Sequence, residues 1–283
     1  MIPKIIKTEK DYERAINRYT EAFGRARNNT LREEILLKLV DVSMEADQWD
    51  MLVRYWSNVI TINPQSAKAR FGRLKYLYIV AESGSSRVWQ QVQTDATEFL
   101  EMAKEEELLS ENVSQWDVLV GEGQEPESKS LNVYLYLVRA RATLELAIQG
   151  AVANKDEALA QVVADLEQVK TLEPKNIEAY RYLAGAAVEK GKLDAARGLF
   201  SERDTAAMEA KTLLEEAVKV APENPLSRVN LLKLKLVFAQ GEPQAREEIK
   251  ALEPEYASLV RDFPTSADAY VALSEYYSVL AVY

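Results

Sequence analysis

The sequence contains neither cysteine nor histidine. The lack of cysteine excludes disulfides and thiolate chemistry, and the lack of both residues excludes most transition-metal sites. Histidine is the commonest general base in enzymes, so its absence removes the usual route to acid–base catalysis. Any metal would have to be a hard cation on carboxylates, and we expect neither a metal nor a cofactor.

Turn-forming residues and long apolar runs are also scarce. The 283 residues include only 10 glycines and 9 prolines, which argues against a loop-rich all-β fold. The most apolar stretch, residues 131–153, is interrupted by Arg139, Arg141 and Glu145, so we interpret it as a helix or helix pair and not as a membrane span. Residues 1–14 lack the apolar core of a signal peptide, and we expect a cytoplasmic protein.

Acidic residues outnumber basic ones, and the formal net charge is −10. Such a surface repels phosphate backbones and anionic lipid headgroups, so we expect neither nucleic acid nor membrane as a partner. Hydrophobic residues make up 47% of the chain, which is ample for a packed core. A protein or peptide partner is the remaining expectation.

Motifs that carry catalysis are missing as well. There is no P-loop, no glycine-rich dinucleotide motif and no G-x-S-x-G sequence. Pairs of glutamates such as Glu33–Glu34 and Glu247–Glu248 could in principle serve as acid and base, but solvated helix faces explain them better. The sequence therefore predicts no enzyme and no catalytic residues.

What the sequence does have is an internal repeat. Four prolines each follow one helix-like segment and precede the next: Pro64, Pro174, Pro222 and Pro264. The segments after Pro174 and Pro264 align without gaps, with Ala179-Tyr180 on Ala269-Tyr270. Repetition at this period is typical of stacked helical hairpins.

The residue types within each repeat fit two packed helices. Small residues allow close approach of the helices, a glycine or aspartate allows the reversal, and a proline ends the second helix. One unit has Tyr180, Leu183, Ala184, Gly191, Ala196, Phe200, Ala217 and Pro222 at these positions. An earlier unit has Leu36, Leu39, Val40, Asp47, Trp49, Leu52, Trp56, Val59, Ile62 and Pro64. We expect the aromatic residues Trp49, Trp56, Tyr180, Phe200 and Tyr270 to lie in the core.

In these positions the chain resembles the tetratricopeptide repeat family, whose unit spans about 34 residues. The resemblance implies an all-α fold, a tetratricopeptide-like α-solenoid in which helical hairpins form a right-handed superhelix. The repeats are irregular and bear insertions. A single hairpin cannot bury both of its faces, so neighbouring hairpins must stack.

The predicted organisation is a single solenoid over residues 1–283. Residues 1–66 hold a half repeat and the first full repeat, 67–130 an irregular repeat with an acidic loop at about 110–130, and 131–283 the C-terminal repeats. Pro174 and Pro222 are 48 residues apart, so extra residues near Ser201–Asp204 either lengthen the second helix or break it.

The last hairpin is predicted to be incomplete. Five apolar residues of its only helix would then have no partner: Val271, Leu273, Tyr276, Tyr277 and Leu280. Either the natural chain continues, or another chain covers this end.

The resemblance also implies a concave surface lined by the first helix of each hairpin. Its mapping gives Lys68, Phe71, Lys75, Arg139, Arg181 and Lys233 as candidate binding residues. Four of these, Lys75, Arg139, Arg181 and Lys233, could share one face and so favour an acidic peptide or a C-terminal carboxylate. The plainer alternative is that these cations are scattered over the surface.

These observations favour a protein-interaction scaffold that binds its partner on the concave face. One alternative is a regulatory or sensing N-terminal region of a larger protein such as an enzyme. Another is a structural subunit that assembles with itself through the open C-terminal hairpin.

Overall fold

The computed structural model describes residues 9–46, 49–111, 130–241 and 244–283. Within these ranges the chain is helical and forms no β-strand, which confirms the all-α prediction. The chain divides into two compact units, residues 1–142 and 143–283, and each is described by itself below. Most of the predicted acidic loop lies outside the described residues.

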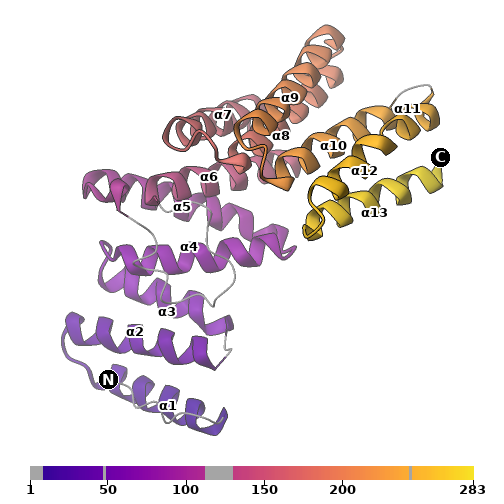
Figure 1. Ribbon diagram of the computed structural model, residues 1–283. Helices are drawn as coiled ribbons and strands as arrows, with labels where there is room; N and C mark the ends of the chain where they lie inside the picture. The colour runs from indigo at the N-terminus through magenta and orange to yellow at the C-terminus, as the bar shows by residue number, and fades with distance from the viewer. Residues whose placement is uncertain (1–8, 47–48, 112–129, 242–243) are drawn as a thin grey trace. The chain divides into compact units, whose positions relative to one another are not determined.

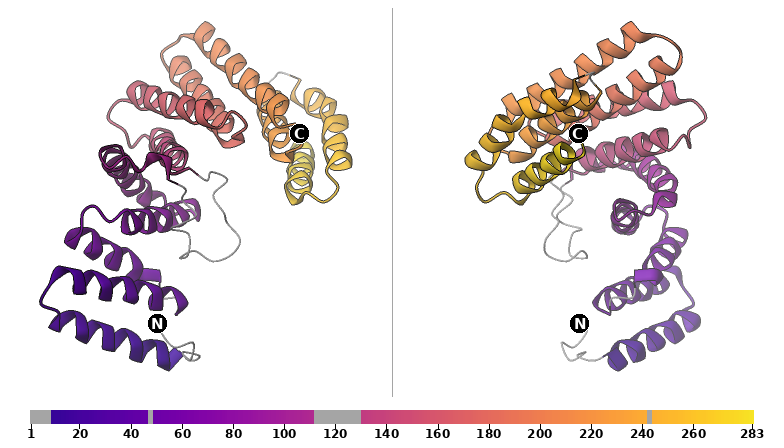
Figure 2. Two further views of the ribbon diagram at one scale, coloured as in Figure 1. Left: turned by 60° about the vertical axis from the view of Figure 1, so that its left-hand side comes forward. Right: turned by 90° about the vertical axis from the view of Figure 1, so that its right-hand side faces the viewer.

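The first unit is a series of antiparallel helices. They are α1 (Glu9–Arg25), α2 (Asn29–Glu45), α3 (Trp49–Ile62), α4 (Ala67–Glu82) and α5 (Trp89–Glu105), followed by α6 (Leu131–Ile148), which crosses the boundary between the units. Short 3-10 turns precede and follow α5, at Ser86–Val88 and Leu108–Ser110. Figure 2 shows α1 and α2 side by side as a helical hairpin.

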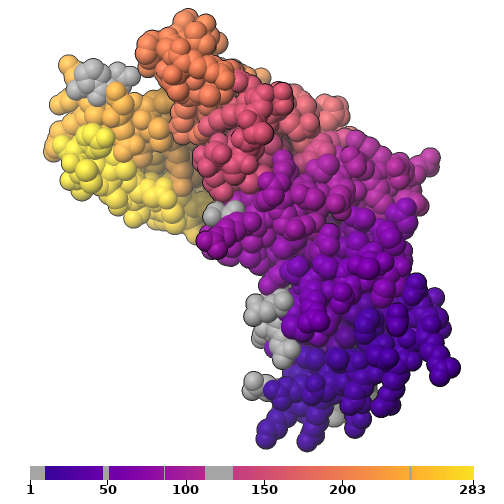
Figure 3. Space-filling model, turned by 180° about the vertical axis from the view of Figure 1, so that it is seen from behind, coloured from indigo at the N-terminus to yellow at the C-terminus, as the bar shows by residue number. Residues whose placement is uncertain are grey.

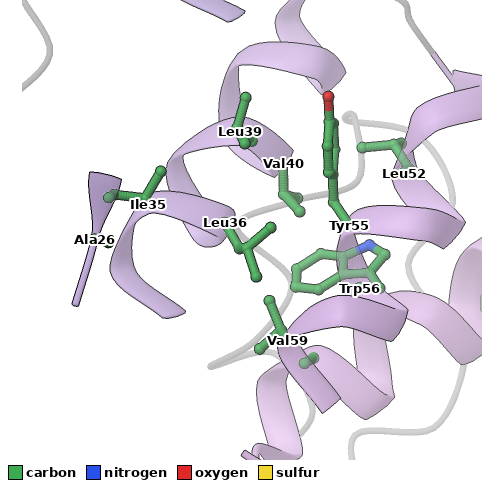
Figure 4. Packing of buried hydrophobic residues seen from close by; sticks show 10 residues of the cluster. Ala26, Ile35, Leu36, Leu39, Val40, Leu52, Tyr55, Trp56 and Val59 are labelled. Atoms are coloured by element: carbon green, nitrogen blue, oxygen red, sulfur yellow. The ribbon is translucent and has the colours of Figure 1, made fainter. Parts of the chain in front are cut away.

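The core of this unit lies between successive helices of the chain. Leu36 and Val40 of α2 meet Trp56 and Val59 of α3, and all four are at most 2% exposed (Figure 4). Trp56 is therefore a core residue, as predicted. Gly72 lets α4 approach this indole closely, because a Cβ at position 72 would lie 2.5 Å from a ring carbon of Trp56.

A buried ion pair fastens α4 to α5. The Arg73 guanidinium donates to both oxygens of the Asp95 carboxylate, at 2.6 and 3.0 Å, and also to the Ser57 hydroxyl. Gln91 donates a further hydrogen bond to Asp95. Because the carboxylate has charge-assisted partners, its burial is compensated, and the pair fixes the register of the two helices.

The second unit continues the same pattern. After α6 come α7 (Lys155–Leu172), α8 (Ile177–Ala196), α9 (Phe200–Val220), α10 (Pro225–Gln240), α11 (Ala245–Ala251), α12 (Glu253–Asp262) and α13 (Ala267–Val282). Side-chain oxygens of the residues before four of these helices accept backbone N–H groups at the helix starts: Asn154, Asn176, Asn224 and Ser266. These N-caps explain where four of the helices begin, and three of them, Asn176, Asn224 and Ser266, follow a proline-containing turn.

The hairpin of α8 and α9 differs from the predicted one (Figure 1). The prediction put the turn at Gly191, but α8 runs through Gly191, and the reversal occurs at 197–199, where Gly198 has a φ of +78°. A glycine inside a helix weakens it only modestly, whereas a left-handed residue ends it. The extra residues therefore lengthen both helices, to 20 and 21 residues.

This shift moves two residues out of the predicted core. Phe200 now begins α9 at the tip of the hairpin and is 58% exposed, and Ala196 is also exposed. The core prediction is wrong for Phe200, since the reversal comes later than the repeat pattern implies. It is right for Tyr180, which is 4% exposed, while the side chain of Trp49 lies outside the described part.

The last helix, α13, has one buried and one exposed side. Tyr276 is fully buried and stacks on Tyr256 of α12, with 4.7 Å between the ring centroids. Tyr276 therefore has a partner, and so do Leu273 and Leu280, which pack against the same cluster. The prediction is wrong for these three residues, because this side of the helix faces α10 and α12. Tyr270, predicted to lie in the core, is 50% exposed because it points away from them.

Candidate functional site

Two of the four binding residues predicted in the first unit are buried. Phe71 is 1% exposed and Lys75 is 6% exposed. The Lys75 ammonium lies 5.8 Å from the centre of the Phe71 ring, which in turn contacts Tyr134 at 5.1 Å. The expectation that these two side chains line an open face is wrong, because α4 is covered by both α3 and α5.

Lys68 and Arg139 are half-buried. The Arg139 guanidinium lies 5.7 Å from the centre of the Tyr136 ring, and the Lys104 ammonium lies 5.9 Å from it. Such cation–π contacts hold the side chains against the helix surface. The role of Lys68 and Arg139 in binding stays a prediction.

In the second unit the predicted cations already have acidic partners. Arg181 forms an ion pair with Glu178 on its own helix and lies over the Tyr182 ring at 4.2 Å. Lys233 of α10 is paired with Glu275 of α13 at 2.9 Å. An acidic ligand would therefore compete with carboxylates of the protein itself for these cations.

The four cations proposed to share a face belong to different units. Lys75 and Arg139 lie in the first unit, and Arg181 and Lys233 in the second. A single basic face made by all of them stays a prediction.

A groove in the second unit is a better-formed candidate. It lies between the C-terminal parts of α8 and α10, over the start of α9, and has a volume of about 530 Å³. It is lined by Val188, Gly191, Lys192, Ala195, Arg203, Asp204, Ala207, Val237, Phe238 and Gly241. We call this the α8–α10 groove.

Small residues bring the groove walls together. A Cβ at Gly191 would lie 3.3 Å from the Cβ of Ala206 and 3.4 Å from the Arg203 carbonyl oxygen, so α8 and α9 touch closely there. Val237 rises beside them from α10 and is 58% exposed. A large apolar side chain left this exposed in a concavity is a site at which burial by a partner is favourable.

The charged side chains around the groove form ion pairs with other side chains of this chain. Lys192 pairs with Glu189 at 2.5 Å, and Arg203 pairs with Asp204 at 2.6 Å. Burial raises the pKa of the Glu189 carboxyl, but hydrogen bonds from Lys155 and Lys192 outweigh that effect, so the pKa lies below its ordinary value. The groove thus presents apolar walls with an ionised but paired rim.

The described residues contain no cluster of three or more side chains suited to hold a metal ion. In the same part of the chain, no helix combines the length and the apolar character needed to cross a bilayer.

The predicted residues Arg181 and Lys233 lie on α8 and α10, but the residues that line the groove were not predicted from the sequence. Val237 follows Lys233 by one helical turn, and Val188 follows Arg181 by two, so each lies on the stripe of the predicted cation. Continuing that spacing toward the helix ends could have found both valines. The depth of the groove could not be found in this way, because it depends on α9 lying beneath.

Comparisons with known proteins give only distant likenesses. No protein-family model matches the chain, and no curated protein matches it. Among solved structures, the chain is similar to YrrB, a tetratricopeptide-repeat protein described as having an unusual peptide-binding site. The sequences are 12% identical, and the alignment has a TM-score of 0.43 and covers 94% of this chain and 100% of that one.

Two further structures show the same kind of likeness. TTC0263, a tetratricopeptide-repeat protein of Thermus thermophilus, is 16% identical with a TM-score of 0.43, over 88% of this chain and 99% of that one. Human IFIT1, as a dimer with m7Gppp-AAAA, is 10% identical with a TM-score of 0.35, over 96% of this chain and 64% of that one. Like those structures' repeats, the helices within each unit follow one another as paired helices without strands in the described residues.

Proposed function

We propose that this chain is a protein-interaction scaffold that captures a peptide segment of its partner in the α8–α10 groove. The observation that carries the proposal is the exposed Val237 in a groove whose other walls are Val188, Ala195 and Ala207. An aliphatic or aromatic side chain of the partner would fill this space as the anchor of the complex.

The size of the groove suits such an anchor. A volume of about 530 Å³ falls within the range of about 300–1,000 Å³ typical of sites that bind small molecules. That volume holds one or two large side chains but not a folded domain. The rim charges, already paired, would set the orientation of the peptide more than its affinity.

The net charge of −10 supports a protein partner over nucleic acid or an anionic membrane. We place the encounter in the cytoplasm, and the proposed activity is binding without catalysis.

Selection from a phage-displayed library of random peptides, followed by fluorescence titration of the selected peptides, tests the groove. The expected result is a set of peptides that share an apolar residue. Val237→Asp should raise the Kd of these peptides at least about tenfold, because it puts a charge where the apolar side chain of the peptide is buried.

The matched control is Val163→Asp on α7, where the replaced valine is 42% exposed and lies outside the groove. This variant should bind the peptides like the unmodified chain. Equal binding by the Val237→Asp variant, or failure to select any peptide, would contradict the proposal.

The predicted acidic-peptide version can be separated in the same assay. Arg181→Gln combined with Lys233→Gln removes both cations and leaves the apolar walls intact. We expect peptide affinities to stay within about threefold, since neither cation lines the groove. A loss as large as that of Val237→Asp would favour charge recognition instead.

A further inference from the structure

The outer side of α13 is an apolar surface of the second unit. In Figure 3 the C-terminal residues of the chain are the yellow atoms. This surface is independent of the α8–α10 groove. Tyr270 is 50% exposed, Val271 52% and Tyr277 47%. Between the tyrosines lies a shallow depression of about 540 Å³, lined by Tyr270, Leu273, Ser274, Tyr277, Ser278 and Ala281. We call these six residues the α13 face.

The composition of α13 is unusual for a helix with a solvated side. Its 16 residues include only two charged ones, Asp268 and Glu275. The Glu275 carboxylate is already paired with Lys233, and neither acidic residue belongs to the α13 face. A helix that is apolar nearly all round is normally covered on both sides.

We propose that the α13 face binds the α13 face of a second copy of this chain, in an antiparallel pair related by a twofold axis. The first support is chemical. The polar atoms that the face's side chains offer are hydroxyls, on Tyr270, Ser274, Tyr277 and Ser278. A hydroxyl both donates and accepts, so two identical faces can hydrogen-bond to each other, which two carboxylates or two ammonium groups could not do.

Two of these hydroxyls already donate within the chain, that of Tyr277 to the Glu253 carboxylate at 3.3 Å and that of Ser278 to the Ser274 carbonyl oxygen at 2.9 Å. Both keep their acceptor capacity, so each can still accept a hydrogen bond from the second copy. Because the α13 face has no charged side chain, burying two copies of it against each other brings no like charges together.

The second support is the pattern of side-chain sizes along the face. A twofold axis beside the middle of the helix, between positions 275 and 276, pairs Tyr270 with Ala281 of the second copy. It also pairs Tyr277 with Ser274 and Leu273 with Ser278. Every large residue then meets a small one, which is what an isologous interface with interlocking helices requires.

The available area sets the strength of the pair. A half-exposed tyrosine offers about 100 Å². The whole face with Val271 therefore offers about 400–500 Å² per copy, or about 800–1,000 Å² in total. Stable complexes bury about 1,200–2,000 Å², so the dimer should be weak, with a Kd on the order of 10–100 µM.

Sedimentation equilibrium of the full chain between about 1 and 300 µM tests the proposal. The expected result is a reversible monomer–dimer equilibrium. Tyr270→Ala and Ala281→Tyr should each raise the dimer Kd at least about tenfold, the first by leaving a hole and the second by placing two tyrosines together.

The combined variant, Tyr270→Ala with Ala281→Tyr, restores a large–small pair at both ends of the interface. Its Kd should return to within about threefold of the unmodified chain. Val163→Tyr adds an aromatic residue elsewhere on the surface and should leave the Kd unchanged. Circular dichroism and melting temperature check that every variant stays folded.

Three outcomes would overturn the proposal. One is a strict monomer at the highest concentration. Another is a dimer that tolerates Tyr270→Ala. The third is a dimer strengthened by Ala281→Tyr alone, which would indicate nonspecific association of apolar surfaces. Val237→Asp should not change dimerisation, so failure of the groove and failure of the α13 face are distinguishable.

Discussion

At the scale of single residues, glycine has two opposite structural roles in this chain. Gly198 ends a helix through its positive φ, while Gly72 and Gly191 lie inside helices and permit close contact with a neighbour. Glycine is expected at turns, so its position in the sequence suggested a turn at Gly191 that does not occur. Only the atoms around each glycine show which purpose it serves.

Gly72→Ala and Gly24→Ala test this difference. A Cβ at position 72 would lie 2.5 Å from the buried Trp56 ring, which has no room to move, so we expect a loss of about 1–3 kcal/mol in the free energy of unfolding. Nothing lies within 4 Å of a Cβ at Gly24 in α1, and alanine there should stabilise by up to about 1 kcal/mol. Urea unfolding followed by circular dichroism measures both, and a neutral Gly72→Ala would show that α4 can shift away.

At the scale of elements, α7 and α8 are joined by a network of charges. Asp156, near the start of α7, accepts hydrogen bonds from Arg197, at the end of α8, and from Lys190 at 3.1 Å. These bonds, first from Arg197 and then from Lys190, lower the pKa of Asp156 to about 2. Lys190 also reaches the buried carboxylate of Asp194 at 2.9 Å. The network holds α7 against α8, which is one of the helices that line the α8–α10 groove.

The sign of its pH dependence follows from the lowered pKa. A carboxyl whose folded pKa lies below its unfolded value stabilises the fold above the unfolded pKa of about 4 and loses that contribution as pH falls toward about 2. Asp156→Asn should therefore melt at a lower temperature than the unmodified chain at pH 7, and the difference should shrink to nothing near pH 2. Thermal melts across this pH range measure it.

The control for this experiment is Asp204→Asn. Its carboxylate pairs with Arg203 on the surface of a single helix and is 65% exposed, so its removal should matter little at any pH. A constant difference between Asp156→Asn and the unmodified chain at all pH values would contradict the assigned role of the network.

At the scale of the whole molecule, the net charge of −10 opposes any meeting of two copies. The α13 face carries no charged side chain, so there is no electrostatic attraction between the two faces for salt to screen. Raising the salt concentration from about 10 to 150 mM should then lower the dimer Kd severalfold, because only the repulsion is screened. Sedimentation at both concentrations decides this, and a dimer weakened by salt would point to ion pairs.

Much of the fold could be predicted because its signals are local. The prolines and the asparagine caps mark helix starts such as those of α8 and α10, and the apolar spacing marks buried positions such as Trp56 and Tyr180. The candidate site was harder. On α10 the sequence predicted Lys233, whose role in binding stays a prediction, whereas the binding residue we favour is Val237, one turn beyond.

The sequence by itself determined that this is a chain of paired helices without thiol or imidazole chemistry, since those conclusions need only residue types and spacing. The tertiary structure alone decided that Phe71 and Lys75 are covered while Phe200, Val237 and Tyr270 are exposed. The physical reason is that burial depends on which helix packs alongside. That neighbouring helix comes from another part of the chain, and the local periodicity of the sequence does not identify it.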